Sequence, residues 1–127
     1  MKQRIHTSEA PPPGGPYSQG VLWNGLLFTA GVVPIDPATG LVVGTTIEEQ
    51  THQVMKNLRT ILQAAEMDFH HAIKVTVHLA RLLDDFAGFN RAYESYFEPE
   101  NRPVRTTVGS ALNGILVEID LIAGKDS

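Results

Sequence analysis

Cysteine is absent from the 127-residue chain. Its absence excludes disulfides, zinc–thiolate sites and thiol nucleophiles, so the fold has to be stabilised by packing alone. A chain without disulfides suits a reducing compartment such as the cytosol.

An excess of positive charge and long apolar runs are also missing. Lys and Arg number 10 against 14 Asp and Glu, which gives a formal net charge of −4. No basic field exists to attract nucleic acid or an anionic membrane. No stretch approaches the roughly 20 apolar residues of a membrane span, and Lys2 and Arg4 are not followed by an apolar run. We therefore expect a cytoplasmic protein with no membrane partner, and the charge argues against a nucleic-acid partner.

The chain has enough apolar residues for one core. It is 43% hydrophobic and too short for two ordinary domains. We expect a single domain over residues 1–127.

Turn signals divide the first third of the chain. Glu9–Pro16 contains four prolines and two glycines and is expected to be extended. Asn24-Gly25 separates the apolar segments 21–23 and 26–33, a pattern typical of a β-hairpin with a tight turn. Asp36–Gly40 combines proline and glycine in the order that favours another turn.

Two amphipathic helices follow from periodicity. Thr46 and Glu49 have the capping-box spacing, and apolar residues recur at helical intervals over residues 47–66. A second helix is expected to begin with Asp84 or Asp85 as its cap and to end before Pro99. Its buried stripe would consist of Phe86, Phe89, Tyr93 and Phe97.

Three further segments have the character of strands. Apolar and polar residues alternate over 73–79, and residues 104–111 and 115–123 flank a second Asn-Gly pair, Asn113-Gly114. The order hairpin, helix, strand, helix, hairpin predicts an α+β fold with the helices on one face of a mixed sheet. Apolar side chains such as Phe28 make a fully hydrated second face costly, which favours self-association.

A two-residue turn at the second Asn-Gly pair would fix the strand register. It would place Thr107 opposite Asp120 and Gly109 opposite Glu118, with Arg105, Thr107, Glu118 and Asp120 on the same side of the sheet. One interpretation is a surface or interfacial salt-bridge cluster. The other is a ligand site, with Gly109 leaving room beside Glu118.

The ligand-site interpretation has a definite chemistry. An arginine binds a carboxylate through two parallel hydrogen bonds, and a neighbouring glutamate can direct a water and transfer its proton. Hydrolysis of a 2-imino acid requires this combination, with Arg105 anchoring the acid and Glu118 directing water to the imine carbon.

Four short motifs resemble those of the RidA (YjgF/L-PSP) family, with matching spacing across nearly the whole chain. They are Pro16-Tyr17-Ser18-Gln19-Gly20, Thr29-Ala30-Gly31 with Pro34, Pro103-Val104-Arg105 and Val117-Glu118-Ile119. The resemblance implies an α+β, chorismate-mutase-like fold with a mixed six-stranded sheet, two helices on one face, and a homotrimer with a ligand cleft between subunits. It also implies hydrolysis of reactive 2-imino or enamino acids to 2-keto acids and ammonia, as by a 2-iminobutanoate/2-iminopropanoate deaminase, with no cofactor and no metal.

The same resemblance implies roles for individual residues. Arg105 would bind the substrate carboxylate and Glu118 would position the hydrolytic water. The other residues implied at the cleft are Tyr17, Gly31, Phe89, Asn90 and Thr107. Two positions depart from the deaminase branch, which usually has cysteine where this chain has Thr107 and commonly serine where it has Ala30. Because water attacks the imine, Thr107 is compatible with the mechanism.

Other functions remain open at this stage. One is deamination of an aminomuconate-type enamine, and another is a non-catalytic trimer that binds small keto or amino acids. A third is the endoribonuclease or translation-inhibitor activity described for some relatives, against which the low net charge argues. None of the five histidines has the helical i, i+4 pairing of a metal site, so no metal is expected.

Overall fold

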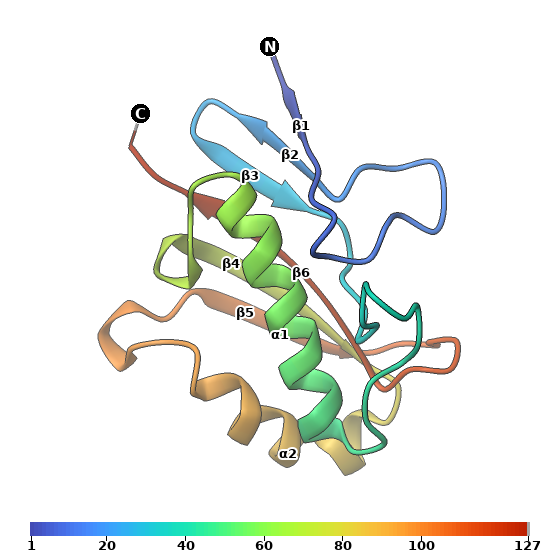
Figure 1. The fold of residues 1–127 in the computed structure, drawn as a ribbon. Helices are drawn as coiled ribbons and strands as arrows, with labels where there is room; N and C mark the ends of the chain where they lie inside the picture. Colours follow the sequence, from blue (N-terminus) through green and yellow to red (C-terminus); the bar gives the residue numbers. More distant parts are fainter. Residues whose placement is uncertain (127) are drawn as a thin grey trace.

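A mixed sheet with helices on one face forms the molecule (Figure 1). The computed structural model describes residues 1–126. The strand order is β1-β2-β3-β6-β4-β5, and this six-stranded α+β arrangement confirms the expected fold class. The elements are β1 Gln3–Ile5, β2 Gly20–Trp23, β3 Leu26–Thr29, α1 Ile47–Ala64, β4 Ala72–Leu79, α2 Leu82–Glu94, β5 Val104–Gly109 and β6 Val117–Gly124.

The first hairpin forms where the Asn-Gly pair predicts it. Asn24 and Gly25 both have positive φ, 50° and 77°, the geometry that a two-residue hairpin turn requires. The second strand is shorter than expected. It ends at Thr29, and beyond it Val32 forms only an isolated bridge with Ile119.

Helix α1 begins at the predicted capping box. The Thr46 side chain accepts from the backbone N–H of Glu49, and the Glu49 carboxylate accepts from the backbone N–H of Thr46. The helix then buries one stripe against the sheet, in which Leu58 and Leu62 are fully inaccessible. Burying a leucine side chain contributes about 1.5–3 kcal/mol, so packing dominates the stability of this helix.

Helix α2 starts earlier than expected. Asp84 and Asp85 lie in its first turn rather than at the cap, and Asp85 pairs with Arg81 at 3.1 Å. Phe89 is completely buried, but Phe86 is 42% exposed, so its inclusion in the buried stripe was wrong. The Phe86 ring centroid lies 5.8 Å from the guanidinium carbon of Arg105 on β5, which is an edge strand of the sheet.

The predicted C-terminal hairpin is wrong. Strand β4 lies between β5 and β6, parallel to β5 and antiparallel to β6. The turn at Gly114 has the expected positive φ of 77°, but the strands beside it are not hydrogen-bonded neighbours. Helix α2 instead provides the crossover that a parallel β4–β5 pair needs.

This topology separates the residues that the hairpin would have joined. Arg105 is level with Val75 and Leu121, whose side chains are buried on the helix-covered face. Glu118 pairs with His78. Side chains alternate along a strand, so Glu118 projects to the face opposite the one that carries Val75 and Leu121. Arg105 and Glu118 of one chain thus lie on opposite faces of the sheet.

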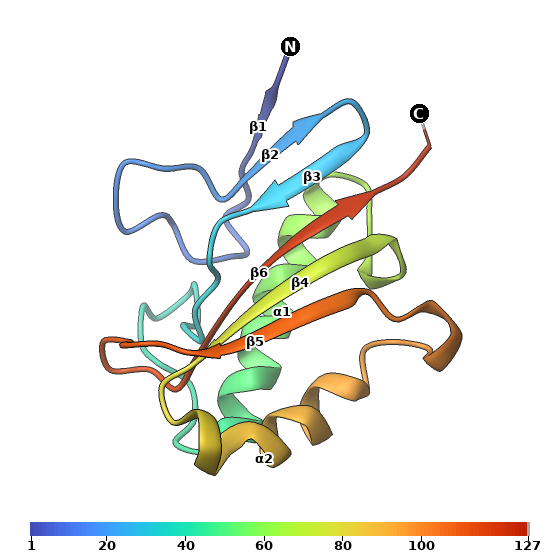
Figure 2. The same ribbon diagram turned by 180° about the vertical axis from the view of Figure 1, so that it is seen from behind.

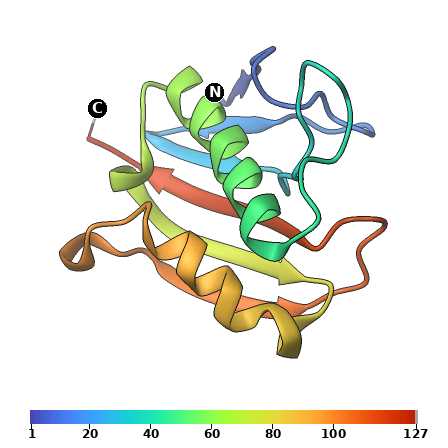
Figure 3. The same cartoon turned by 60° about the horizontal axis from the view of Figure 1, so that its bottom comes forward.

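The face that carries Glu118 has no helix over it within residues 1–126 (Figures 2 and 3). Large apolar side chains are exposed there, including Phe28 at 41% and Val104 at 63%. Beside them His78 lies 3.7 Å from Asp120. Partial burial raises the pKa of the Asp120 carboxyl, and His78 opposes that shift. This helix-free surface is called the open face below.

Neither helix of the described chain is long and apolar enough to cross a membrane.

Candidate functional site

Two separate cavities contain five of the seven predicted site residues. The first, called the Arg105 cavity, has a volume of about 340 Å³ and lies between α2 and the sheet edge at β5. Its lining residues are Asn90, Tyr93, Glu94, Phe97, Arg102, Pro103 and Arg105. The second, called the Glu118 cavity, has a volume of about 250 Å³ and includes Tyr17, Gly31 and Glu118.

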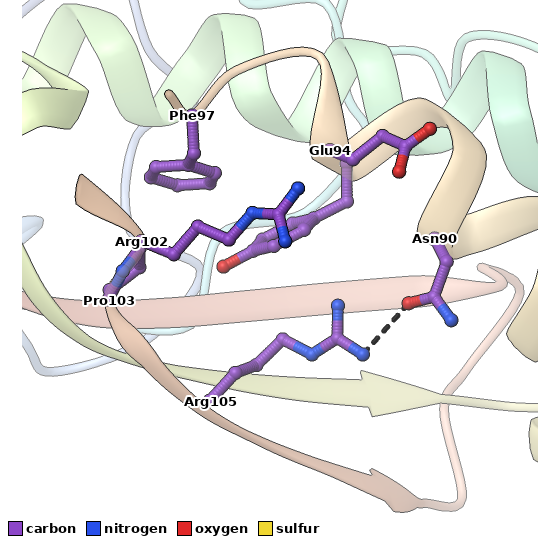
Figure 4. Close-up of a pocket in the computed structure, with 7 residues that line it drawn as sticks. Asn90, Glu94, Phe97, Arg102, Pro103 and Arg105 are labelled. Carbon is purple, nitrogen blue, oxygen red and sulfur yellow. Dashed lines mark hydrogen bonds between the residues drawn. The ribbon is translucent and has the colours of Figure 1, made fainter. Parts of the chain in front are cut away.

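Aromatic rings and one amide hold the Arg105 guanidinium in place. Its carbon lies 4.9 Å from the Tyr93 ring centroid and 5.3 Å from that of Phe89. One terminal nitrogen donates to Asn90 Oδ1 at 2.8 Å (Figure 4). No carboxylate of residues 1–126 pairs with Arg105, so the cation is free to bind a ligand carboxylate.

Tyr93 adds a polar group to the same cavity. The residue is only 8% exposed, and its hydroxyl has no hydrogen-bond partner among the described residues. Burial raises the pKa of the Tyr93 phenol to about 12, although nearby Arg105 acts in the opposite direction. The phenol therefore remains a neutral hydrogen-bond donor at physiological pH.

In the Glu118 cavity, Gly31 is required for space. Gly31 has no positive φ, so backbone strain does not explain the glycine. A Cβ at position 31 would lie 2.8 Å from Glu118 Cδ, closer than non-bonded carbons approach. The missing side chain therefore lets the Glu118 carboxylate lie against the backbone that follows β3.

The proline-rich lead-in forms another wall of this cavity. Pro11, Pro12 and Pro13 line it together with Tyr17, which is 54% exposed. Buried Gln19 anchors the segment, because its amide nitrogen donates to the carbonyl of Pro11 at 2.9 Å. The Tyr17 hydroxyl accepts from the Gly14 N–H at 3.1 Å, which folds the loop over its own ring.

The structure brings together some of the predicted residues and not others. Arg105 and Asn90 share one cavity, whereas Tyr17, Gly31 and Glu118 share the other. The expected single patch of Arg105, Thr107, Glu118 and Asp120 is wrong, since β4 lies between the two strands that carry them.

Three other positions also differ from simple expectation. Phe89 is fully buried behind Arg105 and lines neither cavity, so it supports the guanidinium rather than forming a ligand wall. Thr107 pairs with Val77 and likewise lines neither cavity. Gly109 is level with Leu79, not with Glu118 as predicted.

Five residues that line the Arg105 cavity were not predicted as site residues, and two of them, Tyr93 and Arg102, carry polar groups used in the proposals below. Tyr93 lies one helical turn after Phe89 on α2, a spacing that could have indicated a shared site rather than core alone. Arg102 carried no comparable signal, because it belongs to the irregular segment between the helix and β5.

Residues 7–125 match the family described as Endoribonuclease L-PSP. A RutC family protein of Pyrococcus horikoshii is 44% identical over 99% of this chain and 100% of its own length. The chloroplastic Reactive Intermediate Deaminase A of Arabidopsis thaliana is 40% identical, over 96% of this chain and 65% of the relative.

Solved structures of other proteins have the same fold as this chain. A Thermotoga maritima crystal structure covers 100% of both chains, with 40% identity and a TM-score of 0.93. Escherichia coli TdcF, solved with bound serine, has 32% identity and a TM-score of 0.89 over 98% of this chain and 99% of its own. The α+β fold is thus that of the RidA class of proteins. The chain belongs to the Rid (YjgF/L-PSP, RutC) family.

Proposed function

We propose that this protein hydrolyses reactive 2-imino acids to 2-keto acids and ammonia, at a cleft formed between two copies of the chain. Arg105 of one copy binds the substrate carboxylate, and Glu118 of the neighbouring copy directs the attacking water. The observation that carries the proposal is the Arg105 guanidinium, which lies in an open cavity, held by Asn90 and without an acidic partner among residues 1–126.

The position of Arg105 favours a planar carboxylate. The aromatic rings beneath the guanidinium and the Asn90 oxygen restrict its orientation before a ligand arrives. A preordered arginine loses less conformational freedom on forming two parallel hydrogen bonds. The serine bound to TdcF, a relative with the same fold, supports a small carboxylate as ligand.

A second copy is needed because a single chain separates the two groups. Arg105 projects to the helix-covered face at the β5 edge, and Glu118 projects to the open face. Exposed apolar side chains such as Phe28 and Val104 on the open face favour covering it with protein. We therefore place the complete site at the boundary between copies of a homotrimer.

The reaction can be written with the groups present. Water adds through its oxygen to the imine carbon while Glu118 accepts a water proton, which gives a tetrahedral carbinolamine. The substrate reacts as the protonated imine, so this carbinolamine is neutral. Glu118 returns the proton to the nitrogen, and its carboxylate then takes the hydroxyl proton as the carbonyl forms, the carbon–nitrogen bond breaks and ammonia leaves. Transfer of that last proton to ammonia regenerates the carboxylate. Arg105 holds the carboxylate throughout, and Thr107 takes no part in bond making.

The central experiment measures imine loss. An amino acid oxidase would generate the 2-imino acid in situ, and 2-keto acid and ammonia would be followed with and without this protein. We expect acceleration by the wild type. Saturable binding of 2-oxobutanoate without any acceleration would contradict the enzyme proposal and favour a carboxylate-binding protein.

Two variants test the assigned roles. Arg105→Lys keeps the charge but loses the bidentate geometry, so KM should rise about 10- to 100-fold while the assembly stays intact. Glu118→Gln should lower kcat more than it affects binding. An equal loss of both parameters in Glu118→Gln would contradict its role in directing water.

Mixing the two variants tests whether the site spans two copies. In mixed assemblies of Arg105→Lys and Glu118→Gln chains, about a quarter of the interfaces should combine an intact Arg105 with an intact Glu118. Activity should therefore return when the two are coexpressed. Activity that stays at the level of the separate variants would refute a cleft shared between copies.

A further inference from the structure

The Arg105 cavity contains a second arginine that the proposed hydrolysis does not use. Arg102 lines the same cavity from the segment before β5. Its guanidinium and that of Arg105 extend in the same direction toward the side of the cavity where Asn90 projects from α2 (Figure 4). Substrates with one carboxylate, held by Arg105, would leave this second cation without an anionic partner.

Neither arginine is neutralised within the described chain. The ion pairs of residues 1–126 include neither Arg102 nor Arg105. The one acidic residue at the cavity, Glu94, is solvent-exposed, and its carboxylate is turned away from both guanidinium groups (Figure 4). The space between the arginines is therefore electropositive although the chain as a whole is acidic.

Tyr93 supplies a second, independent indication of a polar ligand. Its hydroxyl is buried and unpartnered among residues 1–126, and the residue lines this cavity. A buried hydroxyl without a partner costs free energy in the unliganded protein and is rare in folded chains. A ligand oxygen bound deep in this cavity would satisfy it.

We propose that the Arg105 cavity selects 2-imino acids that carry a second carboxylate, such as those derived from four- or five-carbon dicarboxylic amino acids. This proposal rests on the hydrolytic function proposed above. Arg105 binds the carboxylate next to the imine, and Arg102 binds the distal carboxylate. The Tyr93 hydroxyl donates to the same distal group. The cavity volume of about 340 Å³ is at the small end of ligand pockets, which suits a molecule of this size.

The test compares two stable keto acids as probes. Binding of 2-oxobutanoate, with one carboxylate, and of 2-oxoglutarate, with two, would be measured by titration calorimetry at low ionic strength. The wild type should bind 2-oxoglutarate more tightly. In Arg102→Ala this preference should fall about 5- to 10-fold, a modest value because Arg102 is exposed.

A matched control removes an arginine elsewhere. Arg4 is exposed on β1, at the opposite edge of the sheet from β5, so Arg4→Ala should leave the preference unchanged. An equal preference in wild type and Arg102→Ala would overturn the proposal. If Arg105→Lys weakens both probes while Arg102→Ala leaves their ratio unchanged, dicarboxylate selection fails and the proposed function stands. If Arg105→Lys weakens neither probe, the proposed function itself fails.

Discussion

Replacing Tyr93 by phenylalanine should have opposite effects on stability and on binding. The substitution removes one oxygen and leaves the ring, which packs at centroid distances of 5.2 Å from Phe89 and 4.9 Å from Phe97. The packing of the core is therefore preserved. What changes is a buried hydroxyl that has no hydrogen-bond partner among residues 1–126.

The expected magnitude follows from this missing partner. An unsatisfied buried hydroxyl costs roughly 1–3 kcal/mol, so Tyr93→Phe should stabilise the unliganded protein by about 1 kcal/mol. For a chain of this length that corresponds to an increase of about 3–5 °C in Tm. Loss of a neutral hydrogen bond to the ligand should at the same time weaken 2-oxoglutarate binding about 2- to 10-fold.

Urea unfolding at a fixed protein concentration measures the first effect, and calorimetric titration measures the second. Tyr96→Phe is the matched control, because the Tyr96 hydroxyl lies 2.7 Å from His52 Nδ1 and is satisfied. That variant should lose about 1 kcal/mol instead of gaining it. If Tyr93→Phe is destabilised as much as Tyr96→Phe, the Tyr93 hydroxyl has a partner in the protein, and its assignment as a ligand donor is refuted.

Three further predictions concern the Glu118 cavity and helix α1. Gly31→Ala should lower kcat by up to about 100-fold, because its Cβ displaces the Glu118 carboxylate. Gly109→Ala is the control: its Cβ would meet nothing nearer than 3.5 Å, so this variant should fold with little loss of stability. Equal kcat for Gly31→Ala and wild type would contradict the steric argument. Thr46→Ala should cost about 1 kcal/mol in urea unfolding by removing the N-cap. Backbone N–H groups, first that of Thr45, lower the pKa of Glu49 below its usual 4.5, so its contribution to stability is present above pH 4.5 and is lost as the pH falls through the lowered pKa. Glu49→Gln should therefore unfold with a weaker dependence on pH below 4.5, and an unchanged slope would contradict that assignment.

Local chemistry made several elements predictable from the sequence. The Asn24-Gly25 turn and the Thr46 capping box are decided by contacts within a few residues, and both form as expected. The alternation over β4 was also correct for Val75, Val77 and Leu79, which are buried. Ile73 is 48% exposed because the register shifts between Ala72 and Lys74.

The pairing of the last two strands was not predictable in the same way. The Asn113-Gly114 pair provides the same local signal as the first Asn-Gly pair, and Gly114 adopts a similar φ. Whether a turn joins neighbouring strands depends on which strand occupies the space between them. Here β4 pairs with both β5 and β6, a choice made by long-range packing and by the α2 crossover.

The wrong pairing predicted for the last two strands affected the predicted site more than the predicted fold. Family motifs indicated Arg105, Glu118, Tyr17 and Gly31, and each lines one of the two cavities. Their distribution between faces depends on strand order, because each strand alternates its side chains. A motif therefore identified which residues to consider without showing which of them meet within one chain.

The separation of the two cavities also restricts how copies can assemble around a shared site. The proposed cleft joins two different surfaces, the Arg105 cavity at the β5 edge of one copy and the Glu118 cavity on the open face of the next. A twofold dimer uses the same patch on both partners, whereas contacts between unlike patches generate rings when the rotation closes. A closed ring would use every Arg105 and every Glu118 once and leave no half-site empty. The proposed cleft therefore requires the β5 edge of one copy to meet the open face of another, an arrangement that a closed ring repeats at every interface.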